Sequence, residues 1–251
     1  MILDSSAALA DPRRRIAISR RILARNGCES MVAGHVSERS SDDAGFWVSP
    51  FGYFDETTPE MVIKVDFDLN RLEGDWDPSP AIQFHAAIYR KRPDVGSVIH
   101  IHSHYVSVFS TVGQPIGMYN VGSVLFYDDQ VLHADDGSGP PVVGTTLAEE
   151  LGDKRVVLIK NHGAIVASQS LERATIEAMM LEVAARYHIE AQAIGGTEFP
   201  EAEVIRGRAA YHRHFLPNMW DANVRRLQRS DPELFEATIL PAGDDLVAHG
   251  R

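Results

Sequence analysis

Hydrophobic and polar positions follow two periods along this chain. Short runs rich in β-branched residues are typical of buried strands, whereas hydrophobic residues three or four positions apart indicate amphipathic helices. The first pattern predicts strands at residues 44–48, 62–67, 95–102, 156–159 and 164–167. The second predicts helices at residues 12–26, 80–91, 103–112, 145–151, 171–194 and, in several pieces, 201–229. Because strands and helices alternate, we expect an α/β fold in which helices flank a sheet.

Proline and glycine mark several of the predicted boundaries. Gly27 follows the first helix, and Gly195-Gly196 follows the long one. Ser79-Pro80 offers a cap and a proline at the first position of a helix. The chain contains no internal repeat and no low-complexity linker, so we expect residues 1–251 to form a single domain that ends in a polar tail.

Composition narrows the class of protein. Hydrophobic residues make up 44% of the 251 residues and charged residues 24%, which is typical of soluble globular proteins. The net charge of −11 argues against nucleic acid as a partner. No hydrophobic run reaches the ~20 residues of a membrane span. A single cysteine, Cys28, excludes an internal disulfide and favours a reducing compartment, so we expect the cytoplasm.

Three histidines offer the clearest chemistry. His100 and His102 lie two positions apart on a predicted strand and therefore point to the same face. His162 follows a second predicted strand and can reach the same point. Three neutral imidazoles around a divalent cation leave coordination positions open, as a catalytic metal requires. A His-x-His pair is also common as two ordinary strand histidines, so the motif alone does not decide.

Several ordered segments give the chain a resemblance to the class II aldolase/adducin family. They are RKRPDVGSVIHIHSHYVSVFS and LIKNHGAIVAS around the histidines, with GHVSERS and WVSPFGYFDE nearer the N-terminus. The resemblance covers about residues 12–230. It implies a three-layer α/β/α sandwich around a largely antiparallel central sheet, with His100, His102 and His162 as ligands of a divalent Zn, Mn, Co or Fe ion. It also implies a homotetramer with active sites between neighbouring subunits.

The chain departs from the family's sugar-phosphate aldolases at three places. Ala81 stands where those aldolases carry an acid/base carboxylate, four residues before His85. Ser79-Pro80 replaces a pair of phosphate-binding serines, and Gly34-His35 replaces the Gly-Asn of their phosphate-binding loop. The resemblance therefore favours a small, non-phosphorylated carboxylate substrate. The Gly-His-Val-Ser form is similar to branches that decarboxylate aromatic acids or oxidatively shorten a prenylated hydroxyphenylpyruvate.

Other residues are candidates for the remaining roles. Without a carboxylate at Ala81, another group must move protons, and the resemblance points to His35, Tyr119 and Tyr211. For substrate binding the candidates are Gly34, Ser37, Ser49 and Ser79, although Ser37 and Ser49 are also typical turn-capping residues.

Two further groups have simpler interpretations. His85 is interpreted as a helix histidine packed near the strand. The acidic residues around His133, which are Asp128, Asp129, Asp135 and Asp136, are interpreted as a solvated loop, with a pocket rim as the alternative.

The sequence thus favours a divalent-metal lyase that breaks a carbon–carbon bond by decarboxylation or retro-aldol cleavage. An iron-dependent oxygenase acting on an aromatic 2-oxo or 2-hydroxy acid is the second hypothesis. A non-catalytic, adducin-like module is the third, and the presence of all three histidines counts against it.

Overall fold

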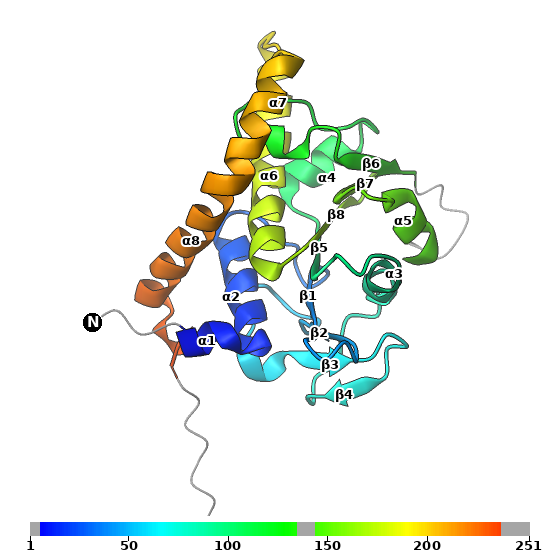
Figure 1. Cartoon of the computed structure of the whole chain (residues 1–251), viewed down its shortest axis with the longest axis vertical. Coiled ribbons are helices and arrows are strands. Elements are labelled where there is room, and N and C mark those ends of the chain that lie inside the picture. The colour runs from blue at the N-terminus through cyan, green and yellow to red at the C-terminus, as the bar shows by residue number, and fades with distance from the viewer. Residues whose placement is uncertain (1–5, 135–143, 237–251) are drawn as a thin grey trace, which may run out of the picture.

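The computed structural model describes residues 6–134 and 144–236, which form one mixed sheet covered by helices (Figure 1). The strand order is β4-β3-β2-β1-β5-β8-β7-β6. Neighbouring strands are antiparallel except β6 and β7, which are parallel. The expected largely antiparallel sheet is therefore confirmed. Its strands are β1 (His35–Arg39), β2 (Phe46–Val48), β3 (Ile63–Val65), β4 (Arg71–Glu73), β5 (Ser97–Ile101), β6 (Gln130–His133), β7 (Val156–Ile159) and β8 (Gly163–Ser168).

Helices cover both faces of the sheet and give the three layers that the resemblance implied. On one face lie α2 (Pro12–Arg25), α4 (His104–Ser110), α6 (Leu171–Ala193) and α8 (Leu216–Ser230). On the other lie α3 (Gln83–Lys91) and α5 (Gly144–Leu151). The remaining helices are α1 (Ser6–Ala10) beside α2 and α7 (Glu201–Ala210), which a π-helical turn, Tyr211–Phe215, joins to α8. No helix among residues 6–134 and 144–236 is long and hydrophobic enough to cross a membrane.

The hydrophobic pattern missed β1 although this strand lies in the middle of the sheet. Its sequence, HVSER, is mostly polar, and residues from elsewhere in the chain bond to the side chains of Ser37 and Glu38. The Ser37 hydroxyl lies 2.7 Å from His85 Nδ1, and Glu38 pairs with Arg15 at 2.7 Å. The pattern also missed β4 and β6. The helix expected from residue 80 begins instead at Gln83, because the Ser79 hydroxyl accepts a hydrogen bond from the Ala81 N–H and forms a local turn.

Alternation along β5 decides which face carries the histidines. Ile99 and Ile101 pack into the core shared with α2 and α6, whereas Val98 packs into the core under α3 and α5. Since successive side chains point to opposite faces, His100 lies on the α3 side, where its ring centroid is 5.3 Å from that of Phe84.

A buried carboxylate on α6 fixes the chain directly after His102. Glu182 is 6% exposed and accepts three hydrogen bonds, from the Ser103 hydroxyl at 2.7 Å and from the Tyr105 and Val106 N–H groups at 2.9 Å. The N–H groups at the start of a helix have no partner within the helix, and a negative charge there is favourable. Glu182 therefore ties the start of α4, and with it the end of β5, to the long helix α6.

This contact predicts a large effect on stability. Glu182→Ala should lower the free energy of unfolding by about 3 kcal/mol, because it leaves buried donors without partners. Urea denaturation would measure the change. Glu190→Ala is the matched control on the same helix, because Glu190 is exposed and pairs with Arg186 one turn away. Equal stability of the two variants would contradict this role for Glu182.

Candidate metal centre

The structure brings together the three histidines that the sequence singled out. His100 lies on β5, His102 directly follows that strand, and His162 lies in the turn between β7 and β8. One ring nitrogen from each lies within 4.8 Å of the other two. The Nε2 atoms of His100 and His102 are 2.7 Å apart, so both rings point to the same place.

The turn that carries His162 depends on its two neighbours. Asn161 has a φ of +59°, a left-handed conformation that asparagine adopts more readily than most residues. At Gly163 a Cβ atom would lie 2.3 Å from the Ile101 carbonyl oxygen and 3.0 Å from His102 Cδ2. Only glycine permits this approach, so the Asn-His-Gly sequence is what holds His162 against the end of β5.

The orientation and charge of the rings suit a metal. His100 Nδ1 lies 2.9 Å from the Ala164 carbonyl oxygen, to which it donates a hydrogen bond, and Nε2 is left as the ligand atom. Burial holds the pKa of His100 well below its ordinary value, and burial together with the neighbouring His162 lowers the pKa of His102 to about 4. Both rings are therefore neutral near pH 7, as ligation requires. The donor set fits a divalent ion with open positions.

His35 lies beside this centre on the adjacent strand. It pairs with His100 across the sheet, and its ring centroid is 5.5 Å from those of His100 and His85. His35 is buried, and neither ring nitrogen has a hydrogen-bond partner among the residues that the structure describes. Burial, with His85 and Arg20 next in effect, lowers the pKa of His35. Two unpartnered nitrogens beside the histidine trio leave hydrogen-bonding capacity for a bound molecule.

Three candidates for substrate binding, which are Ser37, Ser49 and Gly34, already make close contacts within the chain. The buried Ser37 hydroxyl bonds to His85 and, at 2.8 Å, to Tyr89. The Ser49 hydroxyl accepts from the Val36 N–H at 3.1 Å. Gly34 lies so close to Phe54 that a Cβ atom would be 2.5 Å from the ring. Substrate binding by these hydroxyls would require their present bonds to be exchanged.

The remaining candidates have different surroundings. The Ser79 hydroxyl accepts from the N–H of Ala81 just before α3, and Ala81 itself is exposed. His85 is a buried residue of α3, and its ring forms a hydrogen bond with Ser37 on β1. This confirms its interpretation as a helix histidine packed near the strand.

Tyr119 and Tyr211 lie near the long helix α6. The Tyr119 ring packs on His188 with centroids 4.6 Å apart, and its hydroxyl accepts from Gln192. Tyr211 begins the π-helical turn and stacks on Phe215. The described contacts of the two tyrosines are thus with α6 and the π-helical turn. Of the three catalytic candidates, His35 is the one that lies beside the histidine trio of the same chain.

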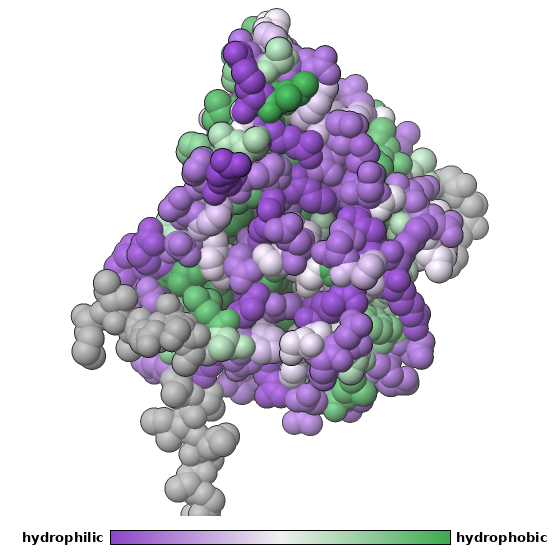
Figure 2. Space-filling view, viewed as in Figure 1, coloured by the Kyte–Doolittle hydropathy of each residue, from purple (hydrophilic) through white to green (hydrophobic). Residues whose placement is uncertain are grey.

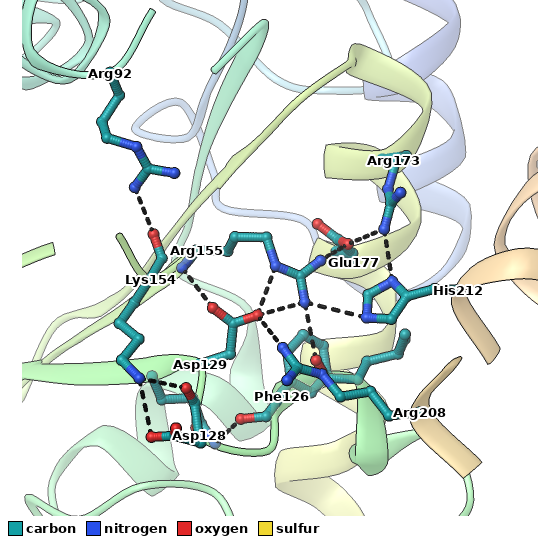
Figure 3. Close-up of polar contacts among 12 residues, drawn as sticks. Arg92, Phe126, Asp128, Asp129, Lys154, Arg155, Arg173, Glu177, Arg208 and His212 are labelled. Atoms are coloured by element: carbon teal, nitrogen blue, oxygen red, sulfur yellow. Dashed lines mark hydrogen bonds and ion pairs between the residues drawn. The ribbon is translucent and has the colours of Figure 1, made fainter. Parts of the chain in front are cut away.

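The acidic loop expected around His133 is not simply solvated. Asp129 is 5% exposed, and it pairs with Arg155 at 2.5 Å and Arg208 at 2.8 Å (Figure 3). The interpretation as a solvated loop was wrong for Asp129, because these arginines lie far from it in sequence and only folding brings them together. Asp128 does lie at a pocket rim and pairs with Lys154 at 2.9 Å. Asp135 and Asp136 fall outside the described residues.

Comparison with known proteins agrees with this fold. The L-fuculose 1-phosphate aldolase from Glaciozyma antarctica PI12 superposes with a TM-score of 0.81 over 90% of this chain and 92% of that one, at 24% identity. Because the identity is low, this likeness shows the fold alone.

Two bacterial relatives are closer in sequence. The 4-hydroxy-3-prenylphenylpyruvate oxygenase/4-hydroxy-3-prenylbenzoate synthase of Streptomyces roseochromogenus subsp. oscitans is 30% identical over 76% of this chain and 72% of that protein. Decarboxylase NovR of Streptomyces niveus is also 30% identical, over 76% of this chain and 74% of that protein. The chain spans between 65% and 74% of the length of three curated relatives that it matches.

A family model settles the classification. The model described as class II aldolase and adducin N-terminal domain matches residues 14–189, which include all three histidines and most of the chain. On that match, the protein belongs to the class II aldolase and adducin N-terminal domain family.

Proposed function

We propose that the protein is a divalent-metal lyase that breaks a carbon–carbon bond in a small, non-phosphorylated oxo- or hydroxy-carboxylic acid, aromatic acids included. The convergence of His100, His102 and His162 carries the proposal, because one nitrogen of each lies within 4.8 Å of the others. The aldolase and decarboxylase relatives support a lyase in general.

Each histidine of the trio has a defined part. His100, His102 and His162 would hold the ion, with the His100 ring fixed by its bond to Ala164. When bound, the ion would supply Lewis-acid stabilisation for the negative charge that develops on the substrate's oxygen. His35 would orient the acid through hydrogen bonds from its unpartnered ring.

The residue at position 81 favours decarboxylation. Ala81 has no group that can take a hydroxyl proton, which retro-aldol cleavage requires. Decarboxylation releases carbon dioxide and needs only a final protonation. We propose that Tyr119 or Tyr211 of a neighbouring subunit supplies that proton.

A homotetramer would allow this arrangement, and we propose one. Val121 and Phe215 are 63% and 51% exposed, and both line a largely hydrophobic pocket of about 400 Å³ that also contains Tyr211. Figure 2 shows hydrophobic side chains among the polar ones at the upper end of the face in view, where α7 lies in Figure 1. Exposed hydrophobic residues that gather around a pocket favour contact with another subunit.

The second candidate is an iron-dependent oxygenase on an aromatic 2-oxo or 2-hydroxy acid. The 30% identity to the prenylphenylpyruvate oxygenase specifically favours it. Three histidine ligands leave positions for both a substrate and dioxygen. This reading requires oxygen consumption, whereas the lyase works anaerobically.

Metal analysis separates these proposals. Protein purified anaerobically without a metal-binding tag should hold about one divalent ion per chain, and His102→Ala should reduce the metal content at least tenfold by removing a ligand. His104→Ala is the matched control, because His104 is exposed and two residues away. Zinc, manganese or cobalt by mass spectrometry supports the lyase, and iron favours the oxygenase. No metal, even after addition, would contradict both and favour the adducin-like module.

A substitution at His35 tests substrate binding. His35→Asn should lower kcat/KM for decarboxylation of aromatic oxo- or hydroxy-acids at least tenfold, because the shorter asparagine side chain has no group at the position of the imidazole Nε2, while metal content stays unchanged. Carbon dioxide release from a panel of such acids would be measured beside His104→Asn as the control. Unchanged kcat/KM would exclude this role, and faster cleavage of sugar phosphates than of acids would overturn the proposed substrate class.

The oligomer can be tested independently. Phe215→Glu should convert the tetramer to smaller species, because it places a charge in a hydrophobic contact. Light scattering after size exclusion gives the mass. Leu72→Glu on β4 is the control, since Leu72 is similarly exposed but lies at the opposite end of the molecule from α7. A wild-type monomer would contradict the tetramer.

A further inference from the structure

A cavity of about 580 Å³ opens beside the end of β8, and its walls come from α6, α7 and the π-helical turn. Arg155, Arg173 and Arg208 line it together with His212 (Figure 3). We call it the arginine pocket. Ile205 and Ala209 add hydrophobic surface to one wall.

The arginine pocket is separate from the histidine trio of the same chain. Ser168 in the pocket pairs with Ser97, whereas His100 pairs with Ile165. Ser97 and His100 are three positions apart on β5, so the two sites are about 10 Å apart along the strand. Because an odd number of positions separates them, their side chains point to opposite faces of the sheet. The pocket therefore lies on the α6 side, and the trio lies on the α3 side.

Positive charge exceeds negative charge in the pocket. Three guanidinium groups face two buried carboxylates, Asp129 and Glu177. A third carboxylate, Asp128, lies at the rim and is neutralised by Lys154. Among residues 6–134 and 144–236, one positive charge of the pocket is thus left without a matching carboxylate.

Two of the three guanidinium groups keep unused donors. Arg155 is committed to the protein, since it bonds to Asp129, Glu177 and the Leu125 carbonyl. Arg173 and Arg208 make their described contacts through Nη2 alone. Their Nε atoms are buried and have no hydrogen-bond partner among residues 6–134 and 144–236. Buried donors are normally satisfied, so each of these two Nε atoms keeps capacity for one acceptor.

Both ring nitrogens of His212 face guanidinium donors. Its Nδ1 lies 2.6 Å from Arg173 Nη2, and its Nε2 lies 3.4 Å from Arg155 Nη2. Burial and the three arginines lower the pKa of His212 to about 4, so the ring is neutral at pH 7. A neutral imidazole accepts at one nitrogen only. Its N–H therefore faces a guanidinium donor, and an acceptor in the pocket would remove this conflict.

We propose that the arginine pocket binds a small organic anion through a carboxylate or phosphate group. Guanidinium groups match the planar or tetrahedral oxygens of these groups with paired hydrogen bonds. The cavity volume lies within the range of small-molecule sites. Such an anion would bridge Arg173 on α6 and Arg208 on α7, and would hold the π-helical turn between α7 and α8.

Calorimetric titration with inorganic phosphate and with citrate, at constant ionic strength, tests the proposal. At least one of them should bind at one site per chain, and Arg208→Gln should weaken that binding at least tenfold. The midpoint of thermal unfolding should rise with that anion in the wild type and much less in the variant. Arg206→Gln is the matched control, because Arg206 lies on the same helix, is exposed and is not in the pocket.

Further titrations decide at which site the anion binds and which class of anion the pocket prefers. Binding must survive in His102→Ala, because its loss there would place the anion at the metal centre. Stronger binding of phosphate would identify phosphate esters as the ligand class, and stronger binding of citrate would identify carboxylates. No saturable binding of either, or equal affinity in wild type and Arg208→Gln, would overturn the proposal. So would a change of oligomeric mass in Arg208→Gln, because the pocket would then receive another subunit.

Discussion

The close approach of β8 to β5 is the constraint on which the candidate centre depends. At Gly163 there is no room for a side chain beside the Ile101 carbonyl and the His102 ring. That contact places the preceding residue, His162, opposite a histidine pair that lies some sixty positions earlier in the chain. A larger residue at this position would push the two strands apart and separate the three nitrogens.

Polar side chains take the place of hydrophobic ones on the strand next to the histidine trio. The central strand β1 presents His35 and Ser37 to the α3 side, where a hydrophobic strand would be expected. Ser37 is satisfied by His85 and Tyr89, but within the described part of the chain His35 has no partner for either ring nitrogen. Burial of an unsatisfied imidazole costs stability, so its presence beside the trio fits a functional rather than a structural position.

The sheet separates two sites of different chemistry. Neutral imidazoles gather on the α3 side, and guanidinium groups with buried carboxylates gather on the α6 side. Glu182 and Glu177 both come from α6, and they contact opposite ends of the sheet: one fixes the chain after His102 and the other pairs with Arg155. The long helix therefore contacts both regions.

The sequence by itself determined the alternation of strands and helices, the family and the three histidines, because hydrophobic periodicity and short motifs are local. It also identified His35 as a departure from the sugar-phosphate aldolases it resembles, since Gly34-His35 replaces the Gly-Asn of their phosphate-binding loop. Only the tertiary structure placed β1 in the sheet centre, buried Asp129 and assembled the arginine pocket. Those features arise from pairing between residues such as Asp129 and Arg208, which are 79 positions apart. Local patterns cannot report such pairs, because each charge alone is typical of a solvated surface.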